Sequence, residues 1–239
     1  MDLVLRKLGD VIAKCWDRAE EKTKQAVSEK YPAPAEEQVT FLFGGELRST
    51  ISRASDRDDF SRAFVEDIES RFPGASANAS SRLSGLIAQV NIHSRWHEGH
   101  YSAADMGIVI SRPSVILTGV DRIQIVRTRS QGLLAQAKLG KGPTRSGKMR
   151  WGSLTYKQTK LIPTHKPYYA LLLYRLSGNP KTALAKFGWQ FCGDHTVREV
   201  QDWLRDGKFP CEMRSAEVIK KLSIGSVGTG RAVCNRALH

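Results

Sequence analysis

The sequence has few cysteines and no long apolar segment, and each scarcity excludes a class of protein. Its four cysteines, Cys15, Cys192, Cys211 and Cys234, lie far apart and never form a CxxC pair. Neither a zinc knuckle nor a dense disulfide framework is therefore indicated. No apolar run reaches the roughly 18 residues that a membrane span needs, and the first residues lack a cleavable signal pattern. We expect a cytoplasmic protein without membrane contact.

Acidic residues are outnumbered by basic ones. The 239 residues include 37 Lys plus Arg against 24 Asp plus Glu, which gives a formal charge of +13. Such an excess favours a polyanionic partner, because cationic side chains neutralise phosphates and release their counterions. Charge alone does not identify that partner, since a basic surface also occurs in proteins that never bind nucleic acid.

The chain divides into an N-terminal helical region, residues 1–82, and a larger domain, residues 83–239. Apolar residues at helical spacing predict helices over residues 2–30, 36–53 and 58–72. Residues 73–81 are small, polar and rich in breakers, so they predict a loop or linker. The helical region is expected to contribute affinity, partner contacts or dimerisation.

From about residue 104 the hydrophobic pattern changes to one typical of strands. Residues 106–110, 115–126 and 131–139 predict three successive strands in an antiparallel meander. A loop over 140–152, a helix over about 153–162 and a buried strand over 168–176 follow. Near the C-terminus a helix over 196–206 ends at Gly207, and residues 223–230 are too glycine-rich for regular structure. This order predicts an α/β fold with a central mixed sheet flanked by helices.

Three polar residues on the predicted strands are candidates for a metal-dependent catalytic site. Asp105 opens one strand, while Gln136 and Lys138 stand two apart on another, so alternation directs both to one face and Ala137 to the core. On neighbouring strands, an aspartate oxygen, an amide oxygen and an ammonium group would converge. Mg²⁺ prefers hard oxygen ligands, and a lysine beside it can orient an attacking water or stabilise developing charge.

The arrangement Asp-x(n)-Gln-Ala-Lys on adjacent strands resembles the PD-(D/E)xK nuclease superfamily, in branches where Gln replaces the middle Glu. The resemblance covers about residues 95–176. Glu98 precedes Asp105 in the stretch His-Glu-Gly-His-Tyr-Ser-Ala-Ala-Asp-Met-Gly, as a Glu does in defence-associated members, and Gln158 lies on the following helix, where related nucleases often carry a Gln.

This resemblance implies a restriction-endonuclease-like deoxyribonuclease that uses Mg²⁺, with Mn²⁺ as a substitute. Asp105, Gln136 and Glu98 would hold the metal, Lys138 would position the water, and Gln158 would orient the lysine or the phosphate. Double-stranded DNA is the expected substrate, in anti-phage defence or restriction. A partner or activator and a homodimer are further expectations. Glu66 or Glu69 is an alternative source of the extra carboxylate.

Basic residues surround these candidates in sequence. Backbone phosphates are the expected partners of five side chains, although a merely solvated loop has the same composition: Lys141, Arg145, Lys148, Arg150 and Lys157. Trp151, Tyr156 and Trp189 would be able to stack on bases, but aromatic residues near strands more often belong to the core. The sequence supports no assignment for them.

Three other interpretations remain. Residues 142–148 match GxxxxGK, but Met149 stands where a P-loop NTPase needs Ser or Thr, and Pro143 lies within the loop. His93, His97 and His100 around Glu98 suggest a zinc site, although their spacing is HExH and not HExxH. A nuclease-like fold that binds nucleic acid without cutting it is the third, because an amide is a weaker Mg²⁺ ligand than a carboxylate.

Overall fold

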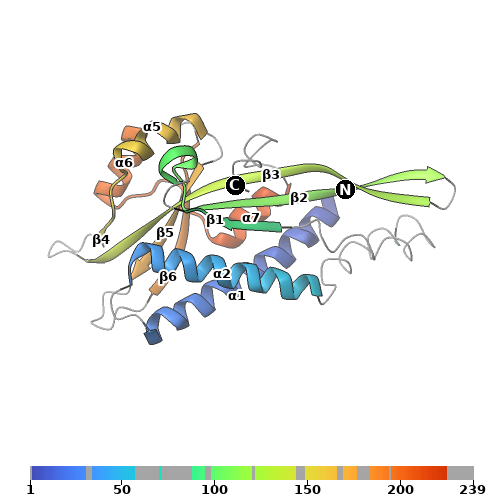
Figure 1. Ribbon diagram of the computed structural model, residues 1–239, viewed down its shortest axis with the longest axis horizontal. Coiled ribbons are helices and arrows are strands. Elements are labelled where there is room, and N and C mark those ends of the chain that lie inside the picture. The colour runs from blue at the N-terminus through green and yellow to red at the C-terminus, as the bar shows by residue number, and fades with distance from the viewer. Residues whose placement is uncertain are drawn as a thin grey trace.

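A mixed sheet of six strands forms the centre of the protein in the computed structural model (Figure 1). The structure describes residues 2–30, 34–56, 70, 88–94, 98–119, 122–143, 149–165, 169–176, 184–193 and 195–224. The strand order is β1-β2-β3-β5-β6, with β4 paired to β3, and only the β3–β5 pair is parallel. The strands are β1 (Ala88–Ile92), β2 (Met106–Gly119), β3 (Arg122–Pro143), β4 (Met149–Arg150), β5 (Tyr169–Leu176) and β6 (Leu184–Phe191).

Two long strands, β2 and β3, replace the meander of three strands that the sequence predicts. The expected break at Arg112-Pro113 is a register shift within a continuous pair, a position where a strand tolerates proline. Gly132, the other expected break, pairs with Val109 in the middle of the hairpin. In Figure 1 the hairpin extends well past the end of β1. The strands β1 and β6 were not predicted.

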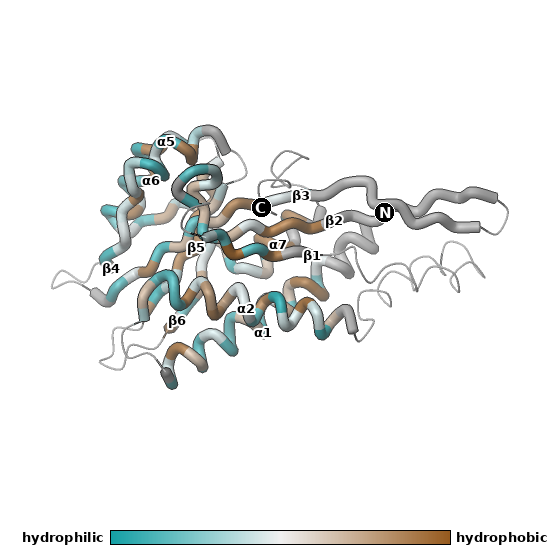
Figure 2. The backbone as a smooth tube through the Cα atoms, in the orientation of Figure 1, coloured by the Kyte–Doolittle hydropathy of each residue, from teal (hydrophilic) through white to brown (hydrophobic). Residues whose placement is uncertain are grey.

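Helices cover both faces of the sheet. Helices α1 (Asp2–Lys30), α2 (Glu36–Asp56) and α7 (Ser215–Ile224) share one apolar core with the sheet, whereas α5 (Tyr156–His165) and α6 (Val197–Asp206) belong to a second. Hydrophilic and hydrophobic residues alternate along α1 and α2 in Figure 2, as expected of helices with one buried side. No helix in the described ranges has the length and apolar character to cross a membrane. The predicted α/β fold, with its mixed sheet, flanking helices and N-terminal helical region, is confirmed.

Local sequence signals explain several helix ends. Thr196 caps α6 in a reciprocal capping box with Glu199, and Gly207 ends the helix at φ 67°, in the left-handed region that favours glycine. The predictions for 2–30, 36–53 and 196–206 agree closely with α1, α2 and α6. Helix α7 was not predicted. The predicted helix over 58–72, Ser70 apart, and the predicted loop over 73–81 lie outside the described residues.

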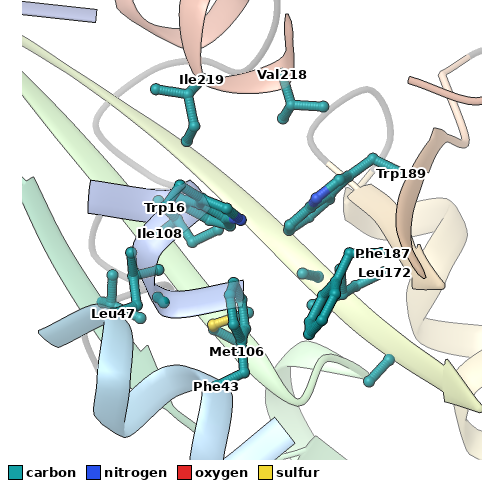
Figure 3. Packing of buried hydrophobic residues seen from close by; sticks show 14 of the residues in the cluster. Trp16, Phe43, Leu47, Met106, Ile108, Leu172, Phe187, Trp189, Val218 and Ile219 are labelled. Carbon is teal, nitrogen blue, oxygen red and sulfur yellow. The ribbon is translucent and has the colours of Figure 1, made fainter. Parts of the chain in front are cut away.

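Aromatic side chains join the N-terminal helices to the sheet (Figure 3). Trp16 of α1 lies 5.4 Å from Phe43 of α2 and 5.5 Å from Trp189 of β6 between ring centroids. Phe43 in turn lies 5.1 Å from Phe187 of β6. All four rings are buried. Because large aromatic rings bury the most apolar area per residue, these contacts make the N-terminal helices part of the main core.

Two consecutive side-chain hydrogen bonds cross this core. The Trp189 Nε1–H donates to Ser215 Oγ at 2.8 Å, and the Ser215 hydroxyl donates to a Glu20 carboxylate oxygen. Together they link β6, α7 and α1. Burial raises the pKa of Glu20 to about 7, against the lowering effects of the Ser215 hydrogen bond and the nearby Lys24 charge.

Candidate functional site

The site lies along a stretch of β3 that pairs with β5 on one edge and with no described strand on the other. On this edge β3 pairs with β2 up to Ala135, opposite Met106, and with β4 from Lys141, opposite Arg150. Backbone N–H groups in the interval need other acceptors, because an unpaired buried N–H is costly. Two carboxylates supply them. Asp105 Oδ2 accepts from the Ala137 N–H at 2.7 Å, and Glu36 Oε2 accepts from the Leu139 N–H at 2.8 Å.

Gln136 and Lys138 alternate with these edge positions, as the sequence predicts. Both side chains are buried, while Ala135, Ala137 and Leu139 pack in the core formed with α1 and α2. The Gln136 Nε2–H donates to Asp105 Oδ2 at 2.5 Å. Lys138 Nζ lies 3.5 Å from Glu36 Oε1. The structure therefore brings Asp105, Gln136 and Lys138 together.

Glu36 is the site residue that the sequence analysis missed. It begins α2, where an acidic side chain is explained by the helix dipole alone. Its place in the fold is what gives it a second role, because the start of α2 meets the open edge of β3 beside Lys138. The alternative carboxylates Glu66 and Glu69 lie outside the described residues.

A tight turn presents Glu98 next to Asp105. Glu98–Ser102 form a π-helical turn, η3, which closes with a hydrogen bond from the Ala103 N–H to the Glu98 carbonyl at 2.9 Å. Ala103 is buried at φ 52°, a left-handed conformation that is strained for alanine. Single π-turns and strained residues of this kind occur often at functional sites.

His93 forms hydrogen bonds with the residues at the end of this turn. Its Nδ1 lies 3.0 Å from Ser102 Oγ and 2.9 Å from the Ala104 carbonyl, and its backbone N–H donates to the Asp105 carbonyl at 2.8 Å. The ring is buried, whereas His100 is exposed. His97 lies outside the described residues. Within the described ranges no group of three or more His, Cys, Asp or Glu side chains has metal-binding geometry.

Gln158 connects α5 to Glu98 through an oriented amide. Its Oε1 accepts from the Thr155 N–H at 2.8 Å, and its own N–H donates to Thr155 Oγ1 at 3.2 Å, so Thr155 and Gln158 form the capping box of α5. Because the amide oxygen is engaged there, Nε2 faces away and donates to Glu98 Oε1 at 2.8 Å. The Thr-x-x-Gln pattern is a local capping signal that the sequence analysis did not use, and the contact with Glu98 depends on the fold.

Tyr169, the first residue of β5, contacts both the turn before Asp105 and the Gln136 side chain. Its hydroxyl donates to the Ala103 carbonyl and lies 3.4 Å from Gln136 Oε1. Burial raises the pKa of Tyr169 well above its ordinary value, so the hydroxyl stays protonated and remains a donor. The one hydroxyl proton goes to the Ala103 carbonyl, so Tyr169 fixes the strained turn and lies next to the Gln136 side chain.

The surroundings of Asp105 disfavour its ionised form. Burial raises the pKa of Asp105 well above its ordinary value, and the negative charges of Glu98 and Glu36 raise it further. The Ala137 N–H and the Lys138 ammonium oppose this shift but do not cancel it. A bound divalent ion would favour the ionised Asp105 carboxylate, because it adds positive charge where Glu98 and Glu36 add negative charge.

The donor set matches Mg²⁺ or Mn²⁺ in chemical type alone, because no three such side chains in the described ranges are arranged to hold a metal ion. Carboxylate oxygens of Asp105, Glu98 and Glu36 are hard ligands of the kind that Mg²⁺ prefers. Gln136 directs its nitrogen, and not its oxygen, toward Asp105. A half-turn of this carboxamide would be needed for its oxygen to share a metal with Asp105.

Of the five residues predicted to contact phosphates, the structure describes three. Lys141, Arg150 and Lys157 are exposed, and Lys141 stands opposite Arg150 in the β3–β4 pair. Arg145 and Lys148 lie outside the described residues. The GxxxxGK segment connects β3 to β4, so a strand follows it where a P-loop would open a helix.

Comparison of the chain with known protein families and with curated proteins finds no match.

Proposed function

We propose that this chain is a divalent-metal-dependent nuclease that hydrolyses phosphodiester bonds of DNA. The observation that supports it best is the convergence of Asp105, Gln136 and Lys138 on one stretch of β3, together with Glu36 from α2. Asp105 and Glu36 also accept hydrogen bonds from β3, but several acidic side chains held together destabilise a fold unless a cation or proton neutralises them.

The residues would divide the reaction among them. Mg²⁺, or Mn²⁺ in its place, supplies polarisation of the phosphate and a lowered pKa for the attacking water. Asp105, Glu98 and Glu36 would hold the ion through their carboxylate oxygens. Lys138 holds the attacking water or the developing negative charge on the phosphate by its ammonium group. The water oxygen would bond to phosphorus and lose a proton, the bond from phosphorus to the leaving deoxyribose oxygen would break, and that oxygen would take up a proton.

Three residues would keep this arrangement in place. Tyr169 fixes the strained turn, and Thr155 orients Gln158, which in turn fixes Glu98. Such supporting contacts typically change metal affinity or activity by about 10–100-fold when they are removed. They touch other side chains, so each acts as a positioning residue.

The proposal also covers the substrate, the cellular role and the partners. Like charges placed opposite each other, as Lys141 and Arg150 are, weaken a strand pair unless an anion lies between them, and a phosphate backbone would be such an anion. Double-stranded DNA, a cytoplasmic role in phage defence or restriction, an activating partner and a homodimer rest on the sequence resemblance.

Cleavage of plasmid and single-stranded DNA by purified protein, with Mg²⁺ or Mn²⁺ and with chelator, tests the proposal. Asp105→Ala and Lys138→Ala are the diagnostic variants, and Lys186→Ala, an exposed lysine on β6, is the matched control. We expect metal-dependent cutting by the parent and the control and none by the two site variants, with all proteins equally folded by circular dichroism.

Other outcomes would contradict the proposal in different ways. Cutting that survives both Asp105→Ala and Lys138→Ala would exclude this site. DNA binding by a parent protein that cuts neither DNA nor RNA, with either metal, would favour the non-catalytic alternative.

A further inference from the structure

Two exposed tyrosines lie on the two elements that meet at the candidate site. In the described part of the chain the large hydrophobic side chains with high exposure are Phe41 at 67%, Tyr101 at 51% and Tyr156 at 72%. Tyr101 belongs to η3 and Tyr156 to α5. These two elements are joined by the hydrogen bond of 2.8 Å between Gln158 and Glu98.

The structure separates the three aromatic residues that the sequence left unassigned. Trp189 is fully buried in the main core. Trp151 is partly buried, with its ring 5.1 Å from Phe209 in a T-shaped contact. Tyr156 alone of the three presents its ring to solvent. Of these three residues, Tyr156 is therefore the one that is available to stack against another molecule.

Helix α5 adds positive charge to this aromatic surface. Lys157 and Lys160 are exposed on the same helix as Tyr156, and the helix contains no acidic residue. Lys160 Nζ lies 4.4 Å from the centroid of the Tyr156 ring. An exposed ring next to ammonium groups matches the two parts of a nucleotide, because bases stack on aromatic rings and phosphates pair with cations.

The position of Tyr156 on the helix limits what it can contact. Successive residues of an α-helix are about 100° apart, so Tyr156 and Gln158 lie on nearly opposite sides of α5. Gln158 is buried at the site, and Tyr156 faces solvent. The ring therefore faces away from the side of α5 that contacts Glu98, and it would meet a base of the strand that lies outside the reacting position.

We propose that Tyr156 and Tyr101, with Lys157 and Lys160, form a stacking surface for the unpaired bases of a nucleic-acid strand that enters the site. This inference rests on the proposed nuclease function and gives it a substrate class: single-stranded segments, such as ends, flaps or opened duplex. Bases within a duplex are covered on both faces by their neighbours, so they offer no free face to a tyrosine. The surface acts on affinity and leaves the chemical step to other residues.

Binding without cleavage tests the inference. Fluorescence anisotropy in EDTA measures the affinity of the full chain for a labelled single strand, for the same strand with abasic sites, and for a blunt duplex. Tyr156→Ala and Tyr101→Ala remove each ring, Tyr156→Phe restores one, and Phe41→Ala is the control, because Phe41 is as exposed but lies on α2.

We expect Tyr156→Ala to weaken binding of the single strand about tenfold, as loss of one stacked base does. Tyr101→Ala should weaken it too, whereas Tyr156→Phe and Phe41→Ala should bind like the parent. On the abasic strand, and on the duplex, Tyr156→Ala should equal the parent. The inference is overturned if Tyr156→Ala binds the single strand like the parent, if its loss is the same on the abasic strand, or if the parent binds no nucleic acid.

These results are separable from the test of the nuclease. Binding that depends on Tyr156 in a protein that cuts nothing with Mg²⁺ or Mn²⁺ would support the stacking surface and refute the catalytic proposal. Metal-dependent cutting by the parent, together with unchanged binding by Tyr156→Ala, would support the catalytic proposal and refute the stacking surface.

Discussion

Replacing Glu20 by glutamine should stabilise the protein at neutral and alkaline pH. The Glu20 carboxylate accepts a hydrogen bond from Ser215, and burial between α1 and α7 raises its pKa from 4.5 to about 7. In the unfolded chain the same group ionises near its ordinary pKa. Between these two values the folded state holds a proton that the unfolded state has released, so stability falls as pH rises from about 4.5 to 7.

The size of the effect follows from the shift. Each pKa unit corresponds to about 1.4 kcal/mol of differential stability, so a rise from 4.5 to about 7 costs roughly 3 kcal/mol once the pH exceeds the folded-state value. Glutamine has the same shape, carries no charge, and still offers an oxygen to Ser215. The variant should therefore gain up to roughly 3 kcal/mol at pH 8, or about 6–12 °C in Tm for a chain of this size.

Urea and thermal unfolding at a series of pH values between 4.5 and 8 would measure this gain. The difference between Glu20→Gln and the parent should be near zero at the acid end and should grow steadily up to pH 7. Glu29→Gln, an exposed glutamate on the same helix, is the control and should leave the parent's pH dependence unchanged. A stability difference between Glu20→Gln and the parent that does not vary with pH would refute this reasoning.

Three further expectations concern packing, backbone and site. Trp16→Ala should lower the free energy of unfolding by about 3–5 kcal/mol in urea titrations, because the buried ring packs on both the second helix and the sheet; a loss below about 1 kcal/mol would contradict the packing described. Gly207→Ala should destabilise by about 1 kcal/mol, since φ is 67° there, whereas Gly45→Ala, in an open position on α2, should stabilise by about 0.5–1 kcal/mol; equal effects of the two substitutions on Tm would contradict this. Gln158→Glu sets a second carboxylate against Glu98 and should reduce metal-dependent cleavage about 10–100-fold, with partial recovery as Mg²⁺ is raised; unchanged activity would exclude the oriented amide.

Strand alternation predicted one part of the centre of the site. The spacing of Gln136 and Lys138 placed both on one face of β3, but Asp105 lies next to them because β2 pairs directly with β3, whereas the predicted meander put another strand between them. Glu98 and Gln158 came from the resemblance, and the hydrogen bond between them could not be read from spacing. It depends on a π-turn that ends in a left-handed alanine, for which no local sequence rule exists.

Glu36 and Tyr169 could not be predicted for a different reason. Each is far in sequence from its partners, and each has an ordinary local explanation, as a helix-start carboxylate and as a buried strand residue. Only the packing of α2 and β5 against β3 shows their second role. The fold class followed from periodicity, whereas the continuous β2–β3 hairpin did not, because a register shift absorbs the proline that suggested a break.

The central claim is that Asp105 and its acidic neighbours bind a divalent cation. Calorimetric titration with Mn²⁺, in two buffers of different ionisation enthalpy, would measure both the affinity and the protons released. The account predicts saturable binding to the parent with proton release, because the pKa of Asp105 is raised before the ion binds, and loss of that binding in Asp105→Asn. Equal Mn²⁺ binding by the parent and Asp105→Asn would contradict it.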